Sequence, residues 1–261
     1  MLPARLMEQH LSRLRRVIAE SEANGMIPEA ECRLALGVGA VDAALGGGLA
    51  GATLHELSAA QPLHFGAASG FALALAVLAR NERHKRPALF IATDFGVLET
   101  GALYGPGLDQ FGLRTDDLIL ARVARPVDAL FATEEALKCR ALSAVIVELQ
   151  DGAADLTATR RLSLAARDGG TLGLLLRAKP DATPSAAATR WRIEPAPSVP
   201  DEFGGLGRTA LILSLVRNRR GPCGRWTVVW DHHEQVFSAL SLGVAATSRD
   251  GSDREALSSA G

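Results

Sequence analysis

The segment Ser143–Leu149 reads Ser-Ala-Val-Ile-Val-Glu-Leu, and its core Ala144–Val147 is apolar at every position. A strand with one face in water would alternate apolar and polar residues, so this strand is expected to be buried on both faces. Strands of this kind belong to parallel sheets that helices cover on both sides. Further strands are expected at 53–57, 88–92, 118–121 and 171–176, and helices at 70–79, 127–139 and 156–167, the last capped by Asp155. The first part of the chain therefore predicts a doubly wound α/β fold.

The pattern changes from Thr189 onward. Short strands are expected at 189–193, 209–216, 226–230 and 235–240, separated by clusters of turn residues. The later connections leave no room for crossover helices, so these strands are predicted to pair antiparallel.

Composition narrows the class of protein. Of the 261 residues, 48% are hydrophobic and 22% charged, which excludes disordered, collagen-like and fibrous classes. The formal charge of −1 gives no overall positive charge that would attract nucleic acid. Binding to nucleic acid would therefore need a local basic patch or a partner protein. Three separated cysteines indicate neither a disulfide framework nor a metal site, and the longest apolar run, 71–79, is too short for a bilayer. We expect a soluble, cytoplasmic protein with no membrane partner.

The two ends of the chain differ from the core. Residues 1–26 predict an amphipathic helix whose seam includes Leu11, Leu14 and Ile18 on a surface rich in Arg and Glu. This helix could fold back on its own core or dock on another chain. Residues 27–243 are predicted to form the core domain, and 244–261 a disordered tail.

A glycine-rich entry segment, 36–57, contains Asp42, Gly46-Gly47-Gly48, Gly51 and Glu56 before a short strand. It resembles the entry segment of RecA-type recombinases. In a P-loop ATPase the strand is followed by Gly-x-x-x-x-Gly-Lys-Ser/Thr, which holds phosphates at a helix N-terminus.

In this chain Gly66, Ser69 and Gly70 occupy the corresponding segment, an apolar residue takes the lysine position, and no lysine precedes Lys85. The segment is either a degenerate phosphate loop for ATP and magnesium or a structural remnant of one.

Two acids are candidates for nucleotide chemistry in the ATPase interpretation. Glu148 ends the strand at which RecA-like proteins carry the magnesium-binding carboxylate, although it or Asp151 could simply cap the next loop. Asp94 ends another strand, where the acid that activates water would lie, although Thr93-Asp94 could equally form a turn. No metal site is predicted from the sequence outside this interpretation.

Arginines gather at the ends of two late strands. Arg190 lies in Arg-Trp-Arg, and Arg217, Arg219 and Arg220 lie in Arg-Asn-Arg-Arg-Gly. Both resemble late strands of the RecA core, where the second would be a basic hairpin beside the nucleotide. With Trp191 and Trp226 nearby, these arginines could grip phosphate and stack on bases, or form a solvated or protein-binding face.

Several short sequence segments resemble a more specific group, the ImuA family of bacterial damage-inducible mutagenesis proteins. They lie at 99–108, 134–137, 155–162, 188–191 and 215–219, the last closing on Trp230-Asp231. The resemblance covers about residues 10 to 240. It implies a RecA-like fold and a role beside an ImuB-like protein and an error-prone C-family DNA polymerase in translesion synthesis during the SOS response.

The resemblance leads to two functional interpretations. In the first, the chain is an adaptor that docks the two polymerase-like partners, with RecA as a further partner, with indirect or weak DNA contact and without conventional ATP hydrolysis. In the second, it is a divergent DNA-stimulated ATPase acting on RecA filaments or DNA. A core that binds nucleotide without hydrolysing it is a third alternative.

Overall fold

The structure, a computed structural model, describes the core of the chain. The described residues are 33–83, 85–149, 153–180, 182–198, 205 and 207–240. The helix expected over 1–26, with Leu11, Leu14 and Ile18, lies outside the described residues, as do Asp151 and the tail expected over 244–261.

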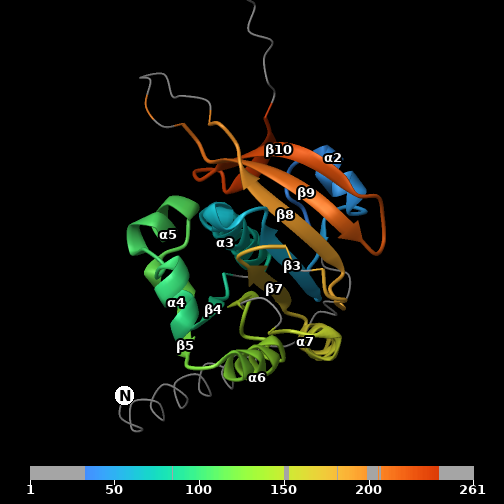
Figure 1. Cartoon of the computed structure of the whole chain (residues 1–261). Coiled ribbons are helices and arrows are strands. Elements are labelled where there is room, and N and C mark those ends of the chain that lie inside the picture. Colours follow the sequence, from blue (N-terminus) through green and yellow to red (C-terminus); the bar gives the residue numbers. More distant parts are fainter. Residues whose placement is uncertain are drawn as a thin grey trace, which may run out of the picture.

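Among the described residues, nine strands form the main sheet, in the order β11-β10-β9-β8-β3-β7-β6-β4-β5 (Figure 1). Six adjacent strands are parallel: β8 (Thr189–Pro195), β3 (Leu54–Ala59), β7 (Leu172–Arg177), β6 (Ala144–Glu148), β4 (Ala88–Thr93) and β5 (Leu118–Val123). Antiparallel strands extend the sheet beyond β8: β9 (Ala210–Asn218), β10 (Gly224–Asp231) and β11 (Val236–Ala239). The predicted α/β class with C-terminal antiparallel strands is confirmed, and the architecture is consistent with a RecA-like fold.

Helices cover both faces of the parallel part of the sheet (Figure 1). On one face α3 (Phe65–Glu82) is buried at twelve consecutive positions, 68–79. On the other face α6 (Pro126–Leu137) and α7 (Leu156–Gly169) pack beside each other, and they enclose a second apolar cluster. The predicted cap of α7 is confirmed, since the Asp155 carboxylate accepts a hydrogen bond from the Ala158 N–H at 2.7 Å.

The apolar character of α3 follows from its place in the core. By length and composition, the stretch Pro62–Glu82 could cross a membrane, but most of it is buried inside the fold. It is the central core helix of the α/β structure, packed against β3, β7 and β8.

The glycine-rich entry segment forms a small unit of its own. β1 (Arg33–Leu34) pairs with β2 (Leu49–Ala50), and α2 (Gly39–Ala44) lies between them. The Asp42 carboxylate accepts hydrogen bonds from the backbone N–H groups of Leu36 and Gly37. Gly48 has a φ of +128°, and a Cβ there would lie 2.6 Å from the Leu34 carbonyl oxygen, so this position requires glycine.

The stretch from Asp94 to Phe111 is more helical than its glycines suggest. The turn expected at Thr93-Asp94 is instead the start of α4 (Asp94–Thr100), because the Thr93 hydroxyl accepts a hydrogen bond from the Gly96 N–H. In the same stretch, α5 (Gly105–Phe111) forms with a proline in its first turn, where the missing N–H costs nothing. These two helices build one wall of the cleft described next.

Candidate functional site

A cleft of about 1060 Å³ lies at the carboxyl ends of the parallel strands. Its floor includes Ala92 at the end of β4, Glu148 at the end of β6 and Ala178 after β7, and residues of α3, α4 and α5 form its walls. Ligands of open α/β sheets bind at this edge. The cleft therefore occupies the position that a nucleotide would take in a RecA-like protein.

The segment Gly66–Gly70, for which the sequence left a degenerate phosphate loop and a structural remnant as alternatives, is helical in the structure. Gly66, Ser69 and Gly70 lie in the first turns of α3, which begins at Phe65 after a 3₁₀ turn, η2 (Pro62–His64). A phosphate loop leaves its backbone N–H groups free to point at the ligand, whereas N–H groups inside a helix bond to carbonyl groups of the preceding turn. The helix thus takes up the N–H groups of Ser69 and Gly70, which lie beyond its first turn, whereas the Gly66 N–H lies in the first turn and has no partner within the helix.

The lysine position of the motif has become part of the core. The two glycines are one residue closer than in the motif, so the lysine position is Phe71 when counted from Gly70 and Ala72 when counted from Gly66, and both residues are 0% exposed. The Phe71 ring lies 5.8 Å from that of Trp191 and 5.6 Å from that of Phe237, measured between centroids. Residue 71 therefore points into the apolar cluster under the sheet and holds β8 and β11 against α3.

A second aromatic ring lies against Gly70. A Cβ at residue 70 would meet the Phe111 Cζ atom at 2.8 Å, so the glycine leaves room for this ring. Phe111 is the last residue of α5 and stacks on Trp230, with 6.5 Å between ring centroids. An aromatic side chain thus lies beside the glycine that the motif would place next to phosphate.

Glu148 lies in the cleft as expected, but its surroundings favour the neutral acid. The side chain is 7% exposed, and its Oε1 accepts a hydrogen bond from the Thr100 hydroxyl at 2.8 Å. Burial raises the pKa of the Glu148 carboxyl and the charge of Glu99 raises it further, while the Thr100 hydrogen bond acts in the opposite direction. A Cβ at residue 96 would lie 3.0 Å from Glu148 Oε1, so α4 packs directly on this carboxyl.

Asp94 has a different partner. Its Oδ1 pairs with Arg122 Nε of β5 at 2.5 Å, and both side chains are about half exposed. The charge of Asp94 is therefore paired with Arg122, which lines the cleft. Asp94 itself has no contact with Glu148 among the described interactions. Taken together, the helical segment at Gly66–Gly70, the buried Phe71 and the enclosed Glu148 do not fit ATP with magnesium.

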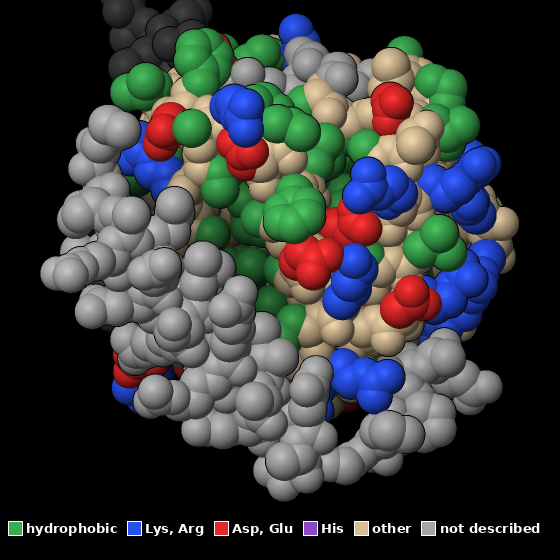
Figure 2. Space-filling view, turned by 90° about the horizontal axis from the view of Figure 1, so that it is seen from below, with side chains coloured by type: hydrophobic (Ala, Val, Ile, Leu, Met, Phe, Trp, Pro, Cys, Tyr) green, Lys and Arg blue, Asp and Glu red, His purple; other side chains and the backbone are tan. Residues whose placement is uncertain are grey.

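Apolar side chains dominate the entrance of the cleft. Large hydrophobic side chains on its rim are strongly exposed, at 93% for Leu63, 73% for Tyr104 and 54% for Phe95. Leu98, on the same short helix as Phe95, is 79% exposed. On the face seen in Figure 2, hydrophobic side chains gather around a hollow, with acidic and basic side chains beside it. Exposed apolar surface of this kind is typical of a protein contact.

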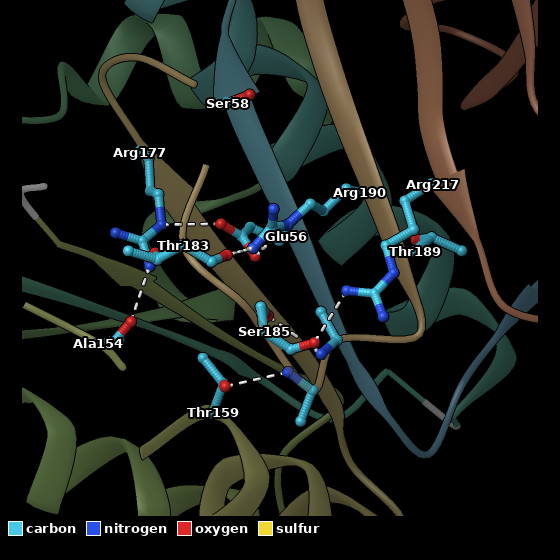
Figure 3. Close-up of polar contacts among 12 residues, drawn as sticks. Glu56, Ser58, Ala154, Thr159, Arg177, Thr183, Ser185, Thr189, Arg190 and Arg217 are labelled. Carbon is cyan, nitrogen blue, oxygen red and sulfur yellow. Dashed lines mark hydrogen bonds and ion pairs between the residues drawn. The ribbon is translucent and has the colours of Figure 1, made fainter. Parts of the chain in front are cut away.

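The predicted arginine group divides into two. Arg190 is mostly buried, and its Nε donates to Glu56 Oε2 at 3.0 Å (Figure 3). The other Glu56 oxygen accepts from Arg177 Nε at 2.9 Å, and Arg177 also donates to the Ala154 carbonyl. Arg190 is thus part of a buried ion network that joins β3, β7 and β8, and does not lie in an exposed patch.

Arg217, Arg219 and Arg220 are exposed. Their position relative to the cleft differs from the expectation. The end of β9 pairs with the first residue of β8, since Asn218 lies opposite Thr189. The hairpin that follows is therefore at the amino ends of the parallel strands, and the cleft is at their carboxyl ends.

Some residues of these sites escaped the sequence analysis. Thr100 and Phe111 contribute only through tertiary contacts that no local pattern reveals. One signal was available in the sequence: an apolar residue at the lysine position of a phosphate motif indicates that the helix start is buried. Among the described residues, no three His, Cys, Asp or Glu side chains gather as a metal site.

Comparison with known proteins found curated relatives that align with about half of the chain. No family model matches it. The curated relatives that it matches include two named Protein ImuA from Caulobacter vibrioides, of strains NA1000 / CB15N and ATCC 19089 / CIP 103742 / CB 15. Each is 36% identical over 136 residues, which make up 48% of this chain and 54% of the relative. The chain thus spans about half the length of the curated relatives it matches.

Proposed function

The similarity to two ImuA proteins supports the membership of this chain in the ImuA family, and on this premise we propose that it is a RecA-like adaptor in damage-inducible mutagenesis. In this proposal the chain acts in the cytoplasm as part of a translesion-synthesis complex of the SOS response. It brings an ImuB-type protein together with an error-prone C-family DNA polymerase, and RecA is a further partner. It does so without a conventional cycle of ATP hydrolysis.

One observation carries the proposal: Phe71, at the lysine position of the phosphate motif, is a core residue with 0% exposure. A RecA-shaped sheet and its helices pack without nucleotide, so loss of the phosphate loop leaves the fold intact. What the loss removes is the means to hold and neutralise phosphates. The domain retains its surfaces, and contact with other proteins is the function that these can serve.

The rim of the cleft is the contact surface that we propose for the ImuB-type partner. Leu63, Phe95 and Tyr104 on this rim, together with Leu98, which lies three residues after Phe95 on α4, would bury apolar area that is now exposed to water. Leu98 is the most informative of them, because at 79% exposure its replacement disturbs little internal packing.

Co-purification tests this contact. The full chain is co-expressed with an ImuB-type protein, as wild type, as Leu98→Arg and as the matched control Leu164→Arg, which alters a half-exposed leucine of α7. We expect the wild type and the control to retain the partner, and Leu98→Arg to lose it while keeping its melting temperature. Retention of the partner by Leu98→Arg would place the contact elsewhere on the molecule.

A separate assay distinguishes the adaptor from the ATPase. Titration with ATP and magnesium is followed by thermal melting and by phosphate release. The adaptor predicts neither stabilisation nor turnover. Turnover that Glu148→Gln abolishes would support the ATPase acting on DNA or RecA filaments, and stabilisation without phosphate release would support nucleotide binding alone.

A further inference from the structure

Two arginines at the end of β9 donate to one backbone carbonyl, and a third arginine, from α7, lies near them. Arg217 Nη1 donates to the Ser185 oxygen at 3.0 Å, and Arg219 Nη2 donates to the same oxygen at 3.2 Å. Figure 3 shows Arg217 reaching Ser185 from the neighbouring strand. Arg160, in the second turn of α7, is close enough to act on Arg219 electrostatically. The arginine cluster defined by Arg160, Arg217 and Arg219 is exposed to solvent.

The loop that contains the Ser185 carbonyl is held in place by hydrogen bonds. Ser185 is 2% exposed, and its hydroxyl accepts a hydrogen bond from the Ala187 N–H. The Ala186 N–H donates to Thr159 Oγ1 at 3.0 Å, and the Ala188 N–H donates to the Leu54 carbonyl at 2.8 Å. The loop is thus fixed to both α7 and β3. The positions of the Arg217 and Arg219 side chains are therefore set by the fold.

The positive charge of the cluster is not balanced. In the part of the chain that the structure describes, none of the three arginines pairs with a carboxylate. Burial lowers the pKa of the Arg219 guanidinium, and the positive charges of Arg217 and Arg160 lower it further. Holding like charges together costs free energy unless an anion joins them. Each guanidinium has five N–H donors, and the Ser185 carbonyl takes one from each of two arginines.

The surroundings favour a carboxylate-bearing protein segment over nucleic acid. Single-stranded nucleic acid binds to aromatic platforms, but Trp191 and Trp230 are 1% and 2% exposed and belong to the core. Trp226 is partly buried against the same core. Duplex DNA needs a long basic stripe for many phosphate contacts, and a chain of net charge −1 carries its surplus only locally. A compact group of guanidinium forks is suited to a few carboxylates at bidentate distance.

We infer that Arg160, Arg217 and Arg219 bind an acidic segment, rich in Asp and Glu, of a partner protein. Arg217 and Arg219 lie at the amino ends of the parallel strands, Arg160 lies on α7, and none of the three lines the cleft. The inference deepens the proposed adaptor function and rests on it: two surfaces at opposite edges of one sheet can hold two partners at once. Ser185 is the positioning residue of the site, acting through its main-chain oxygen.

A peptide-binding assay on the full chain tests the inference. The probe is a fluorescein-labelled dodecamer rich in glutamate, with the matching glutamine peptide as the neutral control and a short oligo-dT strand as the nucleic-acid arm. The variants are Arg217→Gln with Arg219→Gln, Arg160→Gln, and the control Arg114→Gln, whose side chain is 79% exposed on another part of the surface.

We expect the acidic peptide to bind the wild type and Arg114→Gln equally, and the neutral peptide to bind neither. Each arginine removed from the cluster should weaken binding by about tenfold, with the melting temperature unchanged. Equal binding by the double variant overturns the inference. So does tighter binding of oligo-dT that the same substitutions abolish, because the ligand would then be nucleic acid. The assay needs no natural partner, so its failure together with intact ImuB co-purification would overturn this inference alone.

Discussion

The Phe111 ring lies against Gly70, where a side-chain Cβ would come within 2.8 Å of the ring. Gly70 begins the stretch of α3 that would follow a phosphate loop, and Phe111 ends α5. This contact explains why a glycine persists in the helix although no phosphate loop is formed. It links the wall of the cleft to the start of the core helix.

Gly70→Ala is expected to destabilise the protein despite the better helix propensity of alanine. The propensity gain is about 1 kcal/mol, and crowding of a packed ring costs about 1–3 kcal/mol, so the net loss should be about 1 kcal/mol. In a Phe111→Ala background the crowding is gone, and the same substitution should stabilise by up to about 1 kcal/mol. Urea unfolding of the four proteins measures the coupling. An equal effect in both backgrounds would show that the ring does not restrict residue 70.

Restoring the motif lysine should damage the fold without restoring a nucleotide site. Phe71 is fully buried between Trp191 and Phe237, so Phe71→Lys removes an aromatic side chain and buries a charge. We expect a loss of at least about 4 kcal/mol of unfolding free energy, or insoluble protein. Phe71→Leu, which keeps an apolar side chain, should lose clearly less. A folded Phe71→Lys protein that ATP stabilises in thermal melting would contradict the account.

Stability should fall as the pH drops below neutrality, because His55 is buried in its neutral form. Burial lowers the pKa of His55 from 6.5 to about 4, and its ring contacts Thr189 Oγ1 and the Ala50 carbonyl. Between these two pKa values the unfolded chain binds a proton that the folded chain does not, so stability rises with pH there and is lost on acidification. The expected loss between about pH 7.5 and pH 5.5 is about 1.4 kcal/mol.

Urea unfolding at several pH values measures this dependence, and His55→Gln supplies the control. Without the imidazole, the slope of stability against pH in this window should become much flatter, whatever the effect on stability at neutral pH. An unchanged slope in His55→Gln would assign the dependence to other groups.

Breaking the buried ion network should cost more than breaking a surface ion pair. Glu56 is 3% exposed and Arg177 is 0% exposed, so Glu56→Gln leaves a guanidinium charge inside the fold with weaker compensation. We expect a loss of about 3–5 kcal/mol. Asp128→Asn, which removes the partner of the exposed Arg125, should leave the unfolding midpoint almost unchanged. Comparable losses in the two variants would contradict the structural role of Glu56.

The sequence was most informative where burial alone decides the structure. Ala144–Val147 has no polar alternation, and it forms β6 in the middle of the parallel sheet. Asp155 caps α7 as expected, because a cap depends on neighbours only three residues away. The antiparallel pairing of β9 with β10 followed from their short connection.

Longer-range effects were not visible in the sequence. Glycine and proline at 105–107 suggested a loop, yet Pro106 starts a helix that packs on α3. Arg190 was expected to belong to an arginine group that contacts phosphate, solvent or protein, but β8 lies beside β3, and Glu56 pairs with its guanidinium. In the first turns of α3, Phe71 is buried in the core and the Phe111 ring lies against Gly70, and the sequence showed neither contact. Each of these outcomes depends on a partner that is distant in the sequence.

The affinity of an ImuB-type protein for the full chain, measured by calorimetry with and without ATP and magnesium, tests the central claim most directly. The claim is that a RecA-shaped domain docks its partner without using nucleotide. The account predicts the same dissociation constant in both conditions, and a loss of at least about tenfold in affinity for Leu98→Arg. Binding that requires ATP, or that is unaffected by Leu98→Arg, would contradict it.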